Sequence, residues 1–549
     1  MSGPTVVIDR LSATLRHDPA EPPPAADRLR GPLGHAVGGA LEAALRALVL
    51  PPGHWCLARL DLTLGLDLAR PDPALARDWS EAVAAAIERT VREGRAAAPG
   101  ALVHYRHDVE LLADAVAGLA AGRRERLWAW RQTGILRPGD PAPDAAPGPV
   151  LLAALERRPQ HAAAAVLRAA GDCGLAALDR AWGQGGWQCL AALVSGRDAA
   201  AEEAAGPAPD PGTRALARAL LAGSRLASLV RESRLRPAGP TLAAWAVLVL
   251  AETDPASLRR TSARPGLRRL LADGLRTAGG APAPPGLEQA AQPREVRDTG
   301  AAEPADSGGR APAPADHPEA PPGRDAPPQQ PPGAIPPRAD ASGAGPAPDA
   351  PAAADPGARD PAGAPGQDGR PAEEPAAGSA GGAATGWAGL PFLLATAAET
   401  GLPDRALDEP ALAARPLPWV LHAAARALAP GIAPGDPAAL ALAGLGPDRA
   451  GALLRAAAAT PPEQDAVSAL AADWARATAA RLGDERYADD PFGAVAAVAR
   501  RPGRITAETG WIEVHLAFAD TDLAVRRAGL DLDPGWVGWL GAVVRYRYV

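Results

Sequence analysis

The chain has 549 residues, a net charge of −7 and three cysteines. Three cysteines are too few for a disulfide framework, and the absence of any run of about 18 apolar residues argues against a membrane-spanning helix. The N-terminus lacks the basic and apolar regions of a secretory signal, so we expect a cytoplasmic chain that is not inserted in a membrane. A pI near 5.8 argues against general nucleic-acid binding, and we expect no nucleic-acid partner.

Proline and glycine are frequent and unevenly distributed. The 62 Pro and 59 Gly are roughly twice the usual share. Much of this excess lies in residues 277–385, where the only large apolar residues are Leu287, Val296 and Ile335. Such a segment cannot bury enough surface to offset the ~1–2 kcal/mol of backbone entropy lost per residue. We therefore predict an α+β chain in four parts: an N-terminal α+β module over 1–100, an α-helical region over 101–276, a disordered linker over 277–385 and a C-terminal α+β domain over 386–549.

The N-terminal module is predicted to be a β-α-β-α unit. Val7, Leu11, Ala13 and Leu15 share one face of a possible strand over 5–15. A helix over 26–50 follows, and a proline-glycine turn ends it. Strict alternation of apolar residues predicts a strand over 55–68, and helical spacing predicts a helix over 72–93.

The rest of the chain is predicted to be helical except near its end. Short helices separated by Gly and Pro are expected at 109–121, 124–133, 150–170, 213–232, 241–251 and 257–276. Further helices are expected at 388–399, 418–429, 449–459 and 462–482. Apolar residues then alternate over 512–518 and 544–549, which predicts a small antiparallel sheet that contains both runs.

Two motifs resemble ligand sites but have simpler explanations. His104 and His107 have the spacing of a metal-binding pair, yet no third ligand is evident, and Asp108 is placed as the N-cap of the next helix. The run WGQGGW at 182–187 lacks the Lys-Ser/Thr of a phosphate-binding loop, so we expect a turn with two packing tryptophans. Cys173 and Cys189 lack a C-x-x-C spacing, and buried structural thiols are the ordinary interpretation.

Two further segments are candidate partner-binding sites. The first contains Arg259, Arg260, Arg268 and Arg269, and it could contact an acidic partner or form a solvated helix face. The second contains the turn at Asp531 and Asp533, followed by Trp536 and Trp539. These tryptophans could lock a loop onto the core or onto a partner. No nucleophile–base pair or paired carboxylates in a recognisable frame occur, so we predict no catalytic residue, no metal and no cofactor.

Parts of the sequence resemble the tape-measure-type proteins of contractile injection systems, which are phage-tail-like particles. HWCLARLDLTLGLDL at 54–68, LWAWRQTGIL at 127–136 and the helical 151–171 resemble that family's N-terminal module. WAGLPFLLATAAETGL at 387–402 and residues 511–548 resemble the end of large proteins encoded with the same systems, and Gly529 to Trp536 is the most specific block. Two departures are the Arg137-Pro138-Gly139 segment, where the family has Pro-Trp-Trp, and the absence of one long central helix.

The resemblance implies a structural or assembly protein of the tape-measure type, and no catalytic residue carries over from it. Its partners would be tube, baseplate or other injection-system proteins. A fully extended polyproline linker could span about 330 Å, at ~3.1 Å per residue, which leaves room for a role in tube length. The alternative is an interaction adaptor that docks cargo or the system's ATPase.

Overall fold

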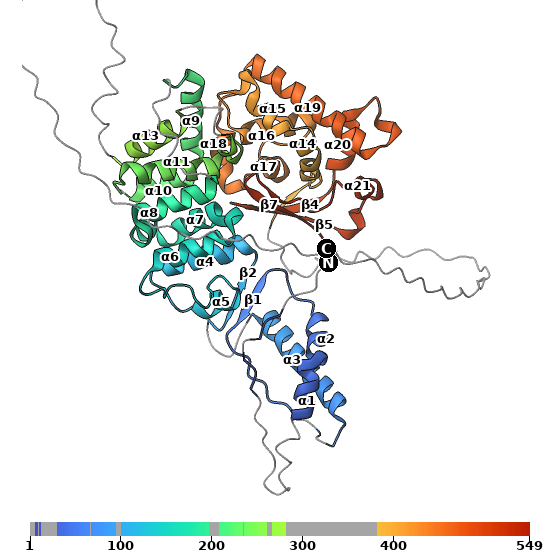
Figure 1. The fold of residues 1–549 in the computed structure, drawn as a ribbon. Helices are drawn as coiled ribbons and strands as arrows, with labels where there is room; N and C mark the ends of the chain where they lie inside the picture. The colour runs from blue at the N-terminus through green and yellow to red at the C-terminus, as the bar shows by residue number, and fades with distance from the viewer. Residues whose placement is uncertain are drawn as a thin grey trace, which may run out of the picture. The chain divides into compact units, whose positions relative to one another are not determined.

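Helices make up most of the described residues, and two small sheets accompany them there (Figure 1). The computed structural model describes residues 6–8, 10–12, 30–65, 67, 69–94, 100–196, 208–233, 235–260, 266–280 and 382–549. Residues 1–287 and 379–549 belong to one compact unit, although more than ninety residues separate them in sequence. The predicted α+β class is confirmed. Most of the predicted linker, residues 281–381, lies outside the described residues, but its predicted ends are wrong, because 277–278 end a helix and 383–385 form a strand.

The first helices form a small unit, which we call the N-terminal helix pair. It consists of α1 (Arg30–His35), a π-helical turn (Ala36–Ala40), α2 (Leu41–Arg46) and α3 (Asp72–Glu93), and α1 and α2 pack along α3. A proline in its first turn starts α3, and Gly94, at φ 62°, ends it. Both predicted helices are confirmed, and the described part of the first is shorter than expected. Leu41, Leu45 and Ala84 form a buried apolar cluster in this unit, and Leu75, Ala76, Ala86 and Val91 of α3 are also buried.

The predicted strands of this region are mostly wrong. Strand β1 (His54–Leu57) pairs antiparallel with β2 (Leu102–Tyr105), but the described residues 58–65 form no strand. Leu60, Leu62 and Leu64 in that stretch are half-buried and alternate with exposed neighbours. The described residues of the predicted strand 5–15, at 6–8 and 10–12, form no strand either and are exposed. Alternation records which side chains are covered, whereas a strand also needs a backbone partner.

The helical region is confirmed, with more breaks than its periodicity predicts. The predicted helices over 150–170, 213–232 and 257–276 each form two helices, interrupted near Pro159, Ser224 and Gly266. The segment 175–195, which was not predicted as a helix, is helical apart from an interruption at Gly183. The helices are α4 (Asp108–Ala120), α5 (Leu127–Gln132), α6 (Pro147–Glu156), α7 (Pro159–Cys173), α8 (Leu175–Ser195), α9 (Pro211–Gly223), α10 (Arg225–Ser233), α11 (Gly239–Thr253), α12 (Pro255–Arg259) and α13 (Leu267–Ala278).

Tryptophans lie at the centre of the helical region. Trp130, Trp187 and Trp245 are fully buried. Trp187 meets both Trp182 and Trp245 edge to face, with ring centroids 4.8 and 5.6 Å apart. The expectation that the two tryptophans of WGQGGW pack together is confirmed. The expected turn is a single break at Gly183 within α8.

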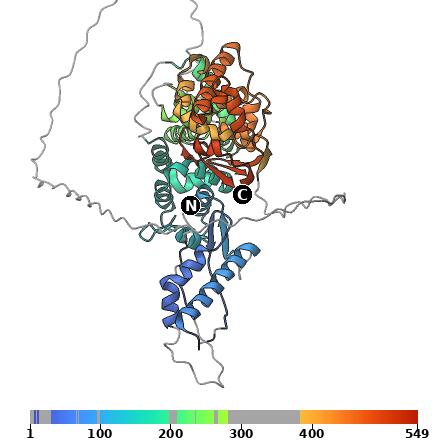
Figure 2. The same cartoon turned by 90° about the vertical axis from the view of Figure 1, so that its right-hand side faces the viewer.

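The C-terminal region places helices on one face of a mixed sheet (Figures 1 and 2). Its helices are α14 (Leu394–Glu399), α15 (Leu402–Asp408), α16 (Leu417–Leu428), α17 (Pro437–Leu442), α18 (Ala450–Leu454), α19 (Pro461–Leu482), α20 (Pro491–Ala499) and α21 (Leu523–Arg527), with short 3-10 turns at 390–393, 410–412, 447–449, 485–487 and 518–520. A capping box between Thr460 and Glu463 starts α19, the longest of them.

The C-terminal sheet has the strand order β3-β4-β5-β7-β6. Its strands are β3 (Ala383–Thr385), β4 (Gly503–Glu508), β5 (Trp511–Leu516), β6 (Gly535–Val537) and β7 (Ala542–Tyr548). The two predicted runs do share this sheet, but β5 and β7 pair in parallel, so the predicted antiparallel arrangement is wrong for them. Alternation is the same for both directions, and α21 and β6 between the two strands return the chain to the start of β5.

Candidate functional site

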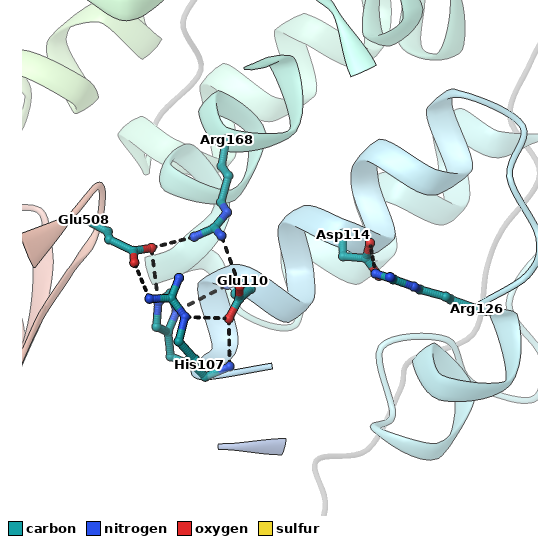
Figure 3. A network of polar contacts seen from close by, with 7 residues as sticks. His107, Glu110, Asp114, Arg126, Arg168 and Glu508 are labelled. Carbon is teal, nitrogen blue, oxygen red and sulfur yellow. Dashed lines mark hydrogen bonds and ion pairs between the residues drawn. The ribbon is translucent and has the colours of Figure 1, made fainter. Parts of the chain in front are cut away.

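A network of charged residues joins the helical region to the C-terminal sheet, and we call it the junction. It consists of Arg106, His107, Glu110, Arg168 and Glu508 (Figure 3). Arg106 precedes α4, Arg168 lies on α7, and Glu508 ends β4. Residues more than 300 positions apart in sequence therefore meet here.

Two arginines bridge two carboxylates in the junction. The Arg106 guanidinium lies 2.6 Å from Glu508 Oε1 and 3.3 Å from Glu110 Oε2. Arg168 donates to Glu508 Oε2 at 2.6 Å and to Glu110 Oε1 at 3.1 Å. The Glu508 side chain is 27% exposed, so this network is only partly screened by solvent. Each carboxylate thus has two cationic partners, which fixes β4 against α4 and α7.

The charges of the junction lower the pKa of both carboxyl groups. The adjacent His107 imidazole and the guanidinium of Arg106 lower the pKa of Glu508 to about 2, although burial raises it. Burial also raises the pKa of Glu110, but the backbone N–H and the charge of Arg106 outweigh burial and lower it. Both groups are therefore ionised at neutral pH, as a structural ion network requires.

His107 connects this network to the start of α4. Its Nδ1 accepts a hydrogen bond from the Glu110 N–H at 3.2 Å, so His107 is the N-cap of α4. Asp108, the predicted N-cap, is instead the first residue of the helix. The His107 ring also stacks on Trp511 of β5, with centroids 4.6 Å apart and planes 15° apart. The cap and the sheet are thus joined through one buried imidazole.

Asp108 organises a second cluster beside the junction. Its carboxylate lies 3.1 Å from His54 Nε2, pairs with Arg158 and lies 3.9 Å from His161 Nε2. The hydrogen bond from His54 and the charge of Arg158 lower the pKa of Asp108 to about 2, against the effect of burial. Burial lowers the pKa of His161, whose ring meets Trp536 edge to face at 6.4 Å.

His104 and His107, which have the spacing of a metal-binding pair, do not converge. His104 stacks on Trp55, with centroids 3.9 Å apart, and its Nε2 contacts the Pro52 carbonyl at 2.9 Å. Within the described ranges, no group of three or more His, Cys, Asp or Glu side chains is arranged to hold a metal ion.

Farther along α4, Asp114 anchors three side chains. It accepts hydrogen bonds from Tyr105 Oη at 2.6 Å and Trp130 Nε1 at 3.0 Å. It also accepts one from Arg126 at 2.8 Å (Figure 3). Gly118 is required here because a Cβ atom would lie 2.3 Å from the Trp130 ring. This cluster fixes α5 against α4.

The three cysteines differ in exposure. Cys56 is buried, Cys173 is half-buried and Cys189 is exposed, so the interpretation as a buried thiol is wrong for Cys189. Burial raises the pKa of Cys56 to about 11 and raises that of Cys173. A raised pKa disfavours the reactive thiolate at neutral pH.

The predicted arginine segment is divided between two environments. Arg260 forms ion pairs with Asp404 at 3.4 Å and with Asp408 in α15, so it connects the helical region to the C-terminal region. Arg259 is exposed beside Gly538, and Arg269 is exposed on α13. Arg268 is half-buried. Residues 261–265 of this segment lie outside the described residues.

The second predicted segment is anchored mainly within this chain. Asp533 accepts from the Tyr546 N–H at 2.6 Å and from Arg545 at 3.2 Å, and buried Asp531 accepts from Tyr548 Oη at 2.8 Å. Trp539 is half-buried against the C-terminal core. Trp536, whose side chain meets His161, is 40% exposed. The turn therefore secures β7, and Trp536 presents part of its ring to solvent.

The arrangement is suited to holding surfaces together. Its ionic groups pair with each other, and its histidines serve as a cap and as stacking partners. Sequence reasoning missed Arg168 and Glu508 as junction residues, and Trp511 as the stacking partner of His107, because no local pattern links positions so far apart. None of the described helices is both long enough and apolar enough to cross a membrane. No family model, curated protein or solved structure matches the chain.

Proposed function

We propose that the protein is a non-enzymatic structural or assembly component of a contractile injection particle, of the tape-measure type. One observation supports this proposal: the segments that resemble that family contact each other in one compact unit. The side chain of Gln132, in the segment 127–136, donates a hydrogen bond at 3.3 Å to the carbonyl of Leu57, which lies in the segment 54–68. The ring of His161, in the segment 151–171, packs edge to face against the ring of Trp536, in the segment 511–548. If these segments form one binding surface for particle components, they should contact each other within one folded unit, as they do.

The same unit constrains how the predicted linker could act. Its two flanks, α13 and β3, both belong to the compact unit. A loop attached to one body at both ends reaches outward by at most half of its contour length. A role in tube length would require the junction to open, whereas a role in assembly would not. We therefore propose assembly as the primary role, with tube, baseplate or other injection-system proteins as partners and a cytoplasmic or particle-bound location.

Electron microscopy of particles from cells that lack the gene tests this proposal. We expect few or incomplete particles, and we expect the full-length chain to restore them. Complementation with Glu508→Gln, which weakens the junction, should restore fewer particles than complementation with Glu485→Gln, an exposed control. Particles of normal number and length in the absence of the gene would contradict the proposal.

A second candidate function is an adaptor that docks cargo or the system's ATPase. It is favoured by apolar side chains exposed near the C-terminal sheet, since Phe518 is 74% exposed and Leu523 is 62% exposed. Exposed arginines such as Arg269 on α13 would bind acidic side chains of such a partner. Affinity purification of the tagged full-length chain separates the two functions: recovery of tube or baseplate proteins supports assembly, and recovery of only cargo or ATPase supports the adaptor.

A further inference from the structure

The N-terminal helix pair has an open groove between α2 and α3. The groove encloses about 750 Å³ and is lined mainly by small side chains. They include Ala43, Ala44 and Ala47 from α2, and Ala76, Ala84 and Ala85 from α3. Of these, Ala43, Ala47 and Ala85 are exposed. Small side chains let a further helix approach closely, at the short end of the usual 8–10 Å between axes.

The helix pair is an incomplete layer. Its buried cluster of Leu41, Leu45 and Ala84 shares no residue with the two large cores of the protein. Helices are stable when their apolar stripe is covered by another layer, and the exposed alanines Ala43, Ala47 and Ala85 leave the groove side of the pair uncovered by the described residues. A covering element is therefore expected.

Residues 6–8 and 10–12 carry the exposed apolar side chains Val6, Val7, Ile8 and Leu11, but they form no helix in the structure and do not line this groove. Residues 13–29 contain only Leu15 and Leu29 as large apolar residues, and residues 281–381 contain only Leu287, Val296 and Ile335. An amphipathic helix needs an apolar residue every three or four positions. The occupant is therefore expected to come from another molecule.

Charges along the groove indicate which molecule this is. Arg77, Glu81, Ala84 and Glu88 follow one another at spacings of four, three and four residues, so they form one stripe on α3. If two α3 helices run antiparallel about a two-fold axis between positions 82 and 83, each Arg77 faces Glu88 of the second copy. At the centre Glu81 lies near Ala84 of the second copy, which is already buried against α2 of that copy and adds little. The two Arg77–Glu88 pairs are self-complementary, as a two-fold interface requires.

We propose that this groove is the dimer interface of the protein, with α3 of a second copy as its occupant. The two helix pairs would then form a four-helix bundle with α3 against α3 at its centre. Helix α3 has 22 residues and so is about 33 Å long. Neither Arg77 nor Glu81 has an ion-pair partner among the described side chains, whereas Glu88 contacts Arg92 on its own helix. This inference does not depend on the proposed function.

Sedimentation velocity of the full-length chain, over a range of concentrations, tests the proposal. We expect wild type to have about twice the mass of the 55.7 kDa chain. Arg77→Glu and Glu88→Arg should each weaken dimerisation at least tenfold, because each places two like charges face to face at both ends of the interface. The double variant should return to within about threefold of wild type, because the exchanged charges again face each other. Arg89→Glu makes the same charge change at an exposed position of α3 outside the groove, and it should leave the dimer unchanged.

Several results would overturn the proposal. One is a wild-type chain that stays monomeric at tens of micromolar. Another is a dimer that the two single variants leave intact, since it would use a different surface. A double variant as weak as either single variant, while circular dichroism shows wild-type helicity, would also exclude this pairing. An equal effect of Arg89→Glu would show that only net charge matters.

Discussion

The junction and the N-terminal helix pair show two ways of holding helices in one chain. At the junction, two arginines bridge two partly buried carboxylates beside a stacked His107 and Trp511, between two large apolar cores. The helix pair has a buried cluster of three residues, and exposed alanines line its groove. Stability should therefore be concentrated around the junction, and the helix pair should open at lower free energy unless a partner covers it.

The largest effect should come from the core of the helical region. Trp187→Ala removes a fully buried ring that packs against Trp182 and Trp245. We expect the free energy of unfolding to fall by about 4 kcal/mol, because a large cavity remains among helices that cannot close around it. Urea unfolding followed by circular dichroism measures the loss. A loss below about 1 kcal/mol would mean that the tryptophan cluster is not the centre of stability.

Acid should next weaken the junction and the adjacent Asp108 cluster. The pKa values of Glu508 and Asp108 are about 2 in the folded protein, below their ordinary values of 4.5 and 3.8. Groups with a lowered pKa stabilise the fold above their unfolded pKa, and this stability is lost as pH falls from about 5 toward 2. We expect a loss of about 3 kcal/mol over that range, allowing for the partial exposure of Asp108. Urea unfolding at pH 7, 5, 4 and 3 measures it.

Two matched variants separate the acid-induced loss of stability at the junction from the loss elsewhere in the chain. Arg415 lowers the pKa of Glu463 to about 2 as well, so Glu463 contributes to the same acid dependence outside the junction. Glu508→Gln and Glu463→Gln should each reduce the pH dependence of the free energy of unfolding. Only Glu508→Gln should remove the share of that dependence that comes from the junction. Hydrogen-exchange protection of β4 and α7, taken relative to the intrinsic exchange rate at each pH, should fall in wild type between pH 7 and pH 4. Unchanged protection there would contradict the assignment of the loss to the junction.

At neutral pH, Glu508→Gln should have a smaller effect. The variant keeps the size of the side chain but removes the charge that Arg106 and Arg168 share, while Glu110 still pairs with both. We expect a loss of about 2 kcal/mol. Glu485→Gln, at an exposed position, should stay within about 0.5 kcal/mol of wild type. Equal stabilities for the two variants would show that the junction charges contribute no net stability.

The smallest global effect should come from the helix pair. Leu45→Ala removes one of the three residues of its buried cluster. We expect hydrogen-exchange protection of α2 and α3 to fall by tenfold or more, while the global free energy of unfolding changes by less than about 0.5 kcal/mol. A global loss as large as that of Trp187→Ala would show that the helix pair unfolds together with the rest of the chain.

Periodicity predicted helices well and strands poorly, and particular residues show why. The helix over 72–93 is bounded by local signals, proline at its start and Gly94 at its end, and the structure has the same bounds. The alternating run after Leu57 has half-buried leucines at every second position but no strand partner over the described residues 58–65. Likewise, the parallel pairing of β5 with β7 depends on the path of the chain between them, which alternation does not record.

The candidate site divides in the same way. Arg260, Asp533 and Trp539 were noticed in the sequence, and the structure places them in contacts within this chain. Glu508 was not noticed, because its partners Arg106 and Arg168 precede it by more than 300 positions. An isolated glutamate after a short strand carries no local signal of an ion network.

By itself the sequence determined the α+β class, most helix positions and the proline- and glycine-rich segment that interrupts the chain, because these depend on local propensity and spacing. Only the tertiary structure decided that residues on both sides of that segment belong to one compact unit. It also decided that His107 caps α4 while stacking on Trp511. Such contacts join positions hundreds of residues apart, and they are selected by packing of whole surfaces, which no window of sequence contains.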